Sequence, residues 1–181
     1  MEFKGAENVL NDFGKYIIQQ SRTNLTKGGK KGTYNYTREL YESLKYTIED
    51  GGDGFIVDFF MEDYGAFQDQ GVKGVKSNYI QNKNTPFSYK PSSNLKGLEY
   101  ATGIFSKWAK YRKMQPRDKK GRFGTYATMG YILANSIKNK GIKATMFFSK
   151  PFDMAIERLP DELFEAFVLD VENAILLAQK R

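Results

Sequence analysis

The sequence predicts an α+β fold in a single domain of residues 1–181, and three patterns support this prediction. Apolar residues recur at helical spacing over residues 6–21 and again from Pro160 onwards, and they alternate with polar residues on both sides of a glycine-rich turn at residues 50–54. We therefore expect an N-terminal helix, a central antiparallel β-hairpin or sheet, a long loop insertion and a long C-terminal helix packed on the sheet.

Residues 6–21 form the first predicted helix. The apolar face of this helix would consist of Ala6, Val9, Leu10, Phe13 and Ile17. The sequence KGGKKGTYNY that follows combines glycines with like charges, which favours a mobile loop over about residues 26–37.

Residues 44–61 predict a β-hairpin. The alternating residues are Leu44, Tyr46 and Ile48 before the turn DGGDG, and Phe55, Val57, Phe59 and Met61 after it. Ile56 and Phe60 fall on the opposite face of the second strand, so we expect helices or a neighbouring subunit to cover part of both faces. The preceding sequence TRELYES predicts a short helical turn.

Residues 72–97 are rich in Lys, Asn, Ser, Gly and Pro without a sustained period, which predicts a long mobile loop that docks on a partner. Two helices follow, over residues 101–113 and from Thr125 to a stop at Gly141, with a mobile loop at about 114–124 between them. Their expected apolar faces are Ile104, Phe105, Trp108 and Tyr111 in the first, and Tyr126, Met129, Ile132, Leu133 and Ile137 in the second. The face expected for the last helix is Leu163, Phe167, Val171, Ala174, Ile175 and Ala178.

The composition removes most familiar catalytic machinery. Because the chain has no cysteine and no histidine, it has no disulfides, thiol nucleophiles, thiolate zinc sites or imidazole bases. No apolar run approaches the roughly 20 residues of a membrane span, and the first residues lack a signal-peptide pattern, so we expect folding in a cytoplasm and no membrane partner. Only carboxylates, Lys, Tyr, Ser or Thr remain for catalysis, so an enzyme is possible but disadvantaged. We propose no catalytic residue, no cofactor and no metal site.

The stretch MEDYGAFQDQGVKG, residues 61–74, could place carboxylates together or could be a structural turn. On a helix, Asp63 and Asp69 are six residues apart and would point in different directions. We therefore interpret these acids as caps, turns and interface charges. The alternative is a carboxylate-dependent metal enzyme built on Asp58, Glu62, Asp63 and Asp69.

The net charge of +7 is unevenly distributed. Between residues 106 and 143 the only acid is Asp118, among eleven Lys and Arg residues, whereas the last helix is acidic. This asymmetry suits either nucleic acid or subunits that meet head to tail. Candidate contacts to DNA or to a partner are Lys30, Lys31, Lys119, Lys120 and Arg122. A stand-alone basic nucleic-acid-binding protein is the alternative function.

Aromatic residues are unusually frequent in the predicted loops, where burial must come from outside the local element. These residues are Tyr34, Tyr36, Tyr79, Phe87, Tyr89 and Phe123. Loop aromatics of this kind are common at subunit contacts, so we expect an obligate homo-oligomer.

Three segments, in their order along the chain, resemble the tail-component family of tailed bacteriophages, whose members are tail-completion and head-to-tail joining proteins. The matching residues are Leu40, Ser43 and Leu44 before the hairpin, and Tyr64, Gly65, Phe67, Asp69 and Gly71 after it. The third segment, YATMGYILANSIKNKGIKATMFFSKPFDMAI, is similar to the family's helix that ends in a Gly-Ile turn before its last long helix. Asp69 stands where Glu is usual, Val72 where Thr is usual, and residues 73–123 look like an enlarged insertion.

The resemblance implies a non-enzymatic virion protein, made in the host bacterial cytoplasm, that forms a ring at the head-tail junction. Such a neck ring, of about six or twelve copies, would join or complete the tail at the portal or adaptor while DNA passes through its lumen. Its partners would be portal, adaptor and tail proteins, with non-specific contacts to DNA. The expected subunit-interface residues are Tyr64, Phe67, Asp69, Gly71 and Phe152.

Overall fold

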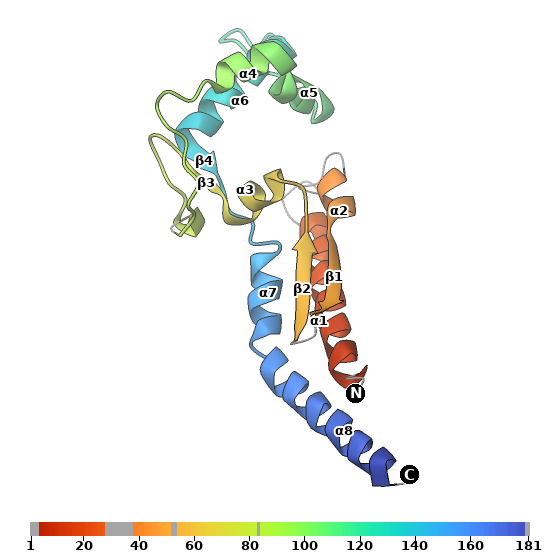
Figure 1. The fold of residues 1–181 in the computed structure, drawn as a ribbon. Helices are drawn as coiled ribbons and strands as arrows, with labels where there is room; N and C mark the ends of the chain where they lie inside the picture. Colours follow the sequence, from red (N-terminus) through yellow and green to blue (C-terminus); the bar gives the residue numbers. More distant parts are fainter. Residues whose placement is uncertain (1–3, 28–37, 52–53, 83, 180–181) are drawn as a thin grey trace. The chain divides into compact units, whose positions relative to one another are not determined.

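The computed structural model describes residues 4–27, 38–51, 54–82 and 84–179, and it confirms the α+β class. The chain divides into two compact units (Figure 1). The first, which we call the hairpin unit, consists of residues 1–65 and 146–181, and the second, the central unit, consists of residues 66–145. The single domain predicted from the sequence thus contains two separately packed parts, each described by itself below.

The hairpin unit combines four helices with one antiparallel β-hairpin. Its elements are α1 (Lys4–Lys27), α2 (Glu39–Ser43), β1 (Lys45–Asp50), β2 (Phe55–Phe60), α7 (Ser149–Ile156) and α8 (Leu159–Gln179). The short turn and the hairpin predicted from the sequence are confirmed, with Tyr46 paired to Phe59 in the ladder. Helix α1 is longer than predicted and includes Thr26 and Lys27, which the sequence assigned to a loop.

Two clusters of apolar side chains form the core of this unit. One contains Ile18, Leu25, Leu40, Leu44 and Phe147. The other is mainly aromatic and joins α1 and the hairpin to α7 through Phe13, Phe59, Phe148 and Phe152. These four rings meet at centroid distances of 5.5–6.1 Å, mostly edge to face, which is a favoured aromatic geometry. The predicted helix and hairpin faces therefore pack against each other.

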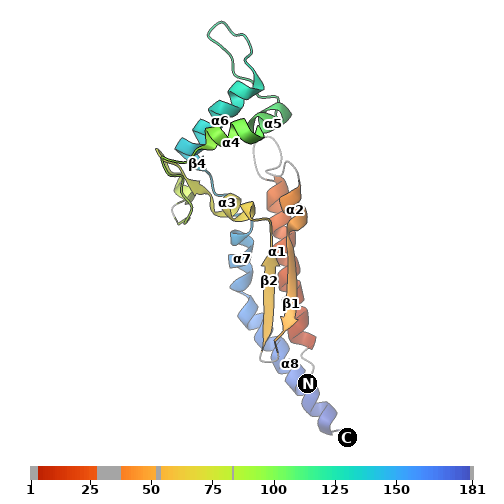
Figure 2. The same cartoon turned by 45° about the horizontal axis from the view of Figure 1, so that its top comes forward.

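Helix α8 lies antiparallel to α1 (Figures 1 and 2). The Arg158 guanidinium lies 5.8 Å from the centre of the Tyr16 ring, whereas Asp170, further along α8, accepts hydrogen bonds of 3.1 Å from the backbone N–H groups of Gly5 and Ala6. The sequence predicts that the last helix packs on the sheet, but the main partner of α8 is α1. Leu159, its first residue, packs against the aromatic cluster near the hairpin.

Asp170 is expected to stabilise the hairpin unit as a helix cap. Its carboxylate satisfies two N–H groups at the N-terminus of α1, which have no partner within the helix, and it sits at the positive end of the helix dipole. Asp170→Ala should lower the free energy of unfolding by about 1–2 kcal/mol. Urea denaturation followed by circular dichroism measures this loss. Asn173→Ala, at an exposed position of the same helix, should change stability by less than about 0.5 kcal/mol, and equal losses in both variants would contradict the capping role.

The central unit combines a small two-stranded ladder with helices. Its elements are most of α3 (Tyr64–Gln70), β3 (Val72–Lys73), η1 (Ile80–Asn82), α4 (Leu95–Thr102), α5 (Ile104–Tyr111), α6 (Tyr126–Lys140) and β4 (Gly141–Ile142). The prediction that residues 72–97 contain only loop is wrong, because β3 pairs antiparallel with β4 and the segment also contains η1 and the start of α4. A strand of two residues is too short to show a period, so its pattern could not reveal it.

The predicted helix over residues 101–113 is two helices separated at Gly103, whose φ is +59°. Glu99 explains the break: its carboxylate is 5% exposed and accepts hydrogen bonds from the backbone N–H groups of Phe105 (2.7 Å) and Ser106 (3.1 Å), as well as from the Ser106 hydroxyl. Helix α5 therefore starts on a buried carboxylate of α4. The predicted apolar face is only partly correct: Phe105 and Trp108 are half-buried, but Ile104 is 52% exposed, and Ala109, which was not predicted, is fully buried.

Helix α6 begins and ends as the sequence predicts. The Thr125 hydroxyl accepts a hydrogen bond from the N–H of Thr128 (3.1 Å), and Gly141 stops the helix with a φ of +86°. The buried positions, however, are Gly130 and Ala134, and Ile132 of the predicted stripe is exposed. Small residues on α6 allow α4 and α5 to approach closely, since a side chain at Gly130 would collide with Glu99 and Ser106. The other residues of the predicted stripe are half-buried: Tyr126, Met129, Leu133 and Ile137.

Candidate assembly surfaces

Residues 61–74 contain the short helix α3, and Gly71 follows directly after its last residue. Gly71 has a φ of +75°, and a side chain at this position would collide with Asn82 and Ala144. The Gly71 carbonyl accepts a hydrogen bond of 2.8 Å from the Thr85 hydroxyl. Asp69 is 4% exposed, whereas Glu62 and Asp63 are exposed, and among the described residues no three acidic side chains gather as metal ligands would. The geometry of the alternative metal site is therefore not formed.

Asn82 holds this part of the chain in place, although the sequence analysis did not select it. Its fully buried side chain donates hydrogen bonds to the carbonyl oxygens of Val72 (3.0 Å) and Ile142 (2.6 Å) and accepts one from the N–H of Ala144 (2.8 Å). One amide thus joins both strands of the ladder to the segment that follows β4.

The five predicted interface residues fall into two groups. Asp69 and Gly71 are buried in the central unit, and Phe152 stacks with Phe148 inside the hairpin unit, so all three have packing roles within the chain. Tyr64 and Phe67 are each 41% exposed on α3, and the ring centroids of Phe67 and Phe87 are 4.5 Å apart. Contact with a second subunit stays a prediction, and exposure favours Tyr64 and Phe67 for it.

Residues 114–124 form a hydrogen-bonded turn that we call the basic turn. Asp118 accepts hydrogen bonds from the backbone N–H groups of Lys120 (2.8 Å) and Arg122 (2.9 Å) and pairs with the Arg122 side chain (2.8 Å). The Arg117 guanidinium lies 4.3 Å from the centre of the Phe123 ring. Of the predicted DNA-contacting residues, Arg122 therefore stabilises the turn through its ion pair with Asp118, whereas Lys119 and Lys120 are exposed. Lys30 and Lys31 lie outside the described residues.

The local structure of the basic turn is expected to depend on pH. The hydrogen bond from the Arg122 side chain, with those from the Arg122 and Lys120 backbone, lowers the pKa of Asp118. Because this pKa is lowered in the folded state, the stabilisation is complete above the ordinary aspartate pKa of about 4 and is lost as the pH falls through the folded-state value. The amide NMR resonances of Lys120 and Arg122 should titrate in that range. An unchanged titration in Asp118→Asn would show that another group is responsible.

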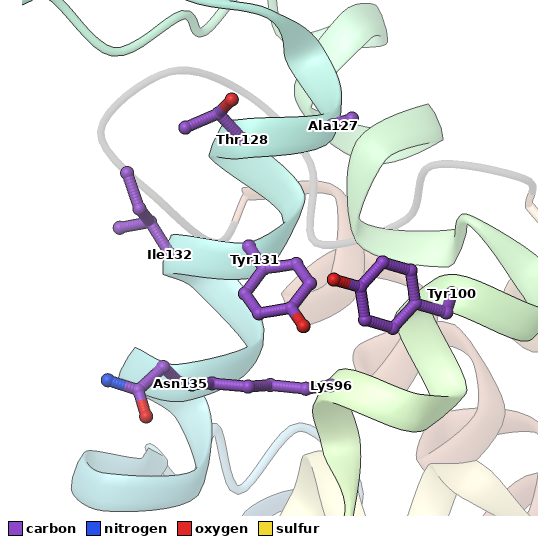
Figure 3. A pocket seen from close by; sticks show the side chains of 7 residues that line it. All are labelled: Lys96, Tyr100, Ala127, Thr128, Tyr131, Ile132 and Asn135. Atoms are coloured by element: carbon purple, nitrogen blue, oxygen red, sulfur yellow. The ribbon is translucent and has the colours of Figure 1, made fainter.

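A shallow depression of about 570 Å³ lies between α4 and α6 of the central unit (Figure 3). Figure 3 shows the rings of Tyr100 and Tyr131 side by side. They meet edge to face, with an interplanar angle of 71° and a centroid distance of 4.8 Å, and the Lys96 ammonium lies 5.3 Å from the centre of the Tyr131 ring. A hydrogen bond with Tyr100 raises the pKa of Tyr131. The site is an open aromatic and basic surface rather than an enclosed pocket.

Helix α8 has no buried residue, although it is rich in large apolar side chains. Leu159, Leu163 and Ala174 are half-buried on the side that faces α1. On another side, Phe164, Val168 and Ile175 are 69%, 37% and 52% exposed, and we call these three residues the α8 stripe. A surface helix that is apolar on more than one side normally packs against a second partner. The sequence predicts apolar spacing in this helix but does not indicate which side of it the rest of the chain leaves exposed.

No helix within the described residues is long and apolar enough to span a membrane. No protein-family model, curated protein or solved structure matches the chain.

Proposed function

We propose that this protein is a structural subunit of the neck of a tailed bacteriophage, where copies of it form a ring that joins or completes the tail at the portal or adaptor. The observation that supports this proposal most directly is the exposed apolar surface of α8. Water-exposed Phe and Ile side chains in a row are costly for a monomer and are typical of a surface that is covered in an assembly.

Two further features support the same function. The segment order before and after the hairpin resembles that of the phage tail-component family, and within it Leu40 and Leu44 are core residues that position the hairpin. The outer face of the hairpin also leaves Ile56 and Phe60 about half exposed, in a chain that presents acidic and basic surfaces on different helices. Such a chain has the apolar and charged surfaces from which subunit contacts are made.

The basic turn supports a secondary role in contact with DNA. Lys119 and Lys120 extend from a braced turn and can neutralise phosphates without reading base sequence. In a ring this contact would be non-specific and would be made with DNA in the lumen. In a stand-alone nucleic-acid-binding protein it would be the main activity.

Capture by a preformed ring separates these two functions. The purified protein is mixed with the candidate portal or adaptor ring of the same phage, and the complex is analysed by size exclusion with light scattering. Stoichiometric capture is expected, and it should persist in Lys119→Gln/Lys120→Gln. A protein that ignores the ring but binds duplex DNA with a strong salt dependence, which the same two substitutions reduce, would overturn the neck assignment in favour of nucleic-acid binding.

A further inference from the structure

The outward surface of α8 has acidic residues between apolar ones. Glu165 and Glu172 are exposed and seven residues apart, so they lie on one side of the helix, and Asp161 shares that side. The α8 stripe runs along one flank of this acidic row. Leu169 and Leu176, which are 59% and 54% exposed, run along the other. The surface therefore offers apolar area with a line of negative charge through it.

This pattern selects the chemistry of the partner. Two α8 helices packed face to face would bring their acidic rows together, and like charges across an interface are destabilising by several kcal/mol. A membrane or a nucleic acid with anionic phosphates would be repelled for the same reason. The suitable partner is a helix with exposed apolar side chains and lysines on one face.

Helix α5 of the central unit has this complementary surface. Ile104 is 52% exposed, and Lys107 and Lys110 lie on the same outward side of the helix, opposite the buried Ala109. Neither lysine forms an ion pair with another described residue, nor do Glu165 and Glu172. The basic turn also exposes an apolar side chain, Phe123, but it is a turn rather than a helix face, and its Arg122 is already paired with Asp118. Among the basic surfaces described, α5 is the better match for α8.

We propose that α8 of one copy binds α5 of the next copy, so that copies associate head to tail. The α8 stripe packs near Ile104, and Glu165 and Glu172 pair with Lys107 and Lys110. A contact between two different surfaces repeats around a ring when the rotation closes, and it needs no two-fold axis. This pairing rests on the proposed ring and names the surfaces that build it.

Two charge-reversal variants test the pairing. Glu165→Lys/Glu172→Lys makes the outward surface of α8 positive, and Lys107→Glu/Lys110→Glu makes the outward surface of α5 negative. Each variant alone should associate at least about 100-fold more weakly than wild type, because like charges then face each other. An equimolar mixture should assemble again, because each reversed helix meets an oppositely charged helix on the other variant. Analytical ultracentrifugation at about 1–100 µM measures both effects.

The control is Glu7→Lys/Glu42→Lys, which makes the same charge change at exposed positions of α1 and α2 and should assemble as wild type does. Circular dichroism verifies that all variants fold. If wild type assembles and the reversed variants assemble equally well, or if the mixture stays monomeric, the α8–α5 pairing is wrong while the ring remains. If wild type stays monomeric at about 100 µM, the pairing is overturned, and the neck assignment is then decided separately by capture on the portal ring.

Discussion

Asn82→Asp is expected to destabilise the central unit by about 4 kcal/mol. The wild-type amide donates two hydrogen bonds to backbone carbonyl oxygens, whereas a carboxylate has no proton to donate and would place its negative charge against those two oxygens. The side chain is fully buried, so water cannot compensate for the lost bonds. The only tryptophan, Trp108, lies in α5, and its fluorescence during urea unfolding reports on this unit.

The matched control for this change is the neighbouring residue. Gln81→Glu introduces the same charge at an exposed position of η1 and should cost less than about 0.5 kcal/mol. Lowering the pH should restore part of the stability of Asn82→Asp, because a buried carboxyl without donors has a raised pKa and regains one donor when it is protonated. Equal stability of the two variants, or no recovery at low pH, would contradict the bridging role of Asn82.

Phe147→Ala is expected to cost about 3–5 kcal/mol in the hairpin unit. The Phe147 side chain is 1% exposed and belongs to the cluster with Leu25 and Leu40, so its removal leaves a cavity among groups that cannot easily collapse. Its backbone carbonyl also accepts a hydrogen bond of 3.2 Å from the Asn24 side chain, which the substitution leaves in place. Urea unfolding followed by circular dichroism at 222 nm reports on this helix-rich unit.

Phe164→Ala removes the same atoms from the α8 stripe and separates stability from assembly. Because Phe164 is 69% exposed, its loss should change the free energy of unfolding of the monomer by less than about 1 kcal/mol. The same change should weaken association of the copies, since a large aromatic side chain at the centre of a contact contributes strongly to it. A large loss of monomer stability would show that Phe164 is packed within its own chain, and an unchanged assembly would remove it from the interface.

The elements predicted correctly are those whose apolar repeat continues over many residues or whose end is marked by a characteristic capping residue. The N-terminal helix, the β-hairpin and α6 each repeat apolar residues over several turns or strand positions, and Thr125 and Gly141 set the ends of α6. Local pattern was enough at Gly141 because local geometry, a positive φ, decides the residue type.

The elements that the sequence did not predict depend on contacts between distant residues. The ladder of β3 with β4 joins residues about 70 apart and relies on Asn82, and the break between α4 and α5 relies on a buried Glu99, a residue type that is normally exposed. For α8 the sequence predicted a single apolar face that included Phe167 and Ile175, which are 46% and 52% exposed, so it did not distinguish the side that contacts α1 from the side left in solvent. That distinction, which decides the candidate assembly surface, required the packing of α1.

Self-assembly is best tested by the mass of the protein in solution, measured by light scattering coupled to size exclusion. We expect a single species whose mass is a whole-number multiple of the 20.7 kDa chain and which dissociates when the α8 charges are reversed. A folded 20.7 kDa monomer at every concentration, unchanged by addition of the portal or adaptor ring, would contradict it.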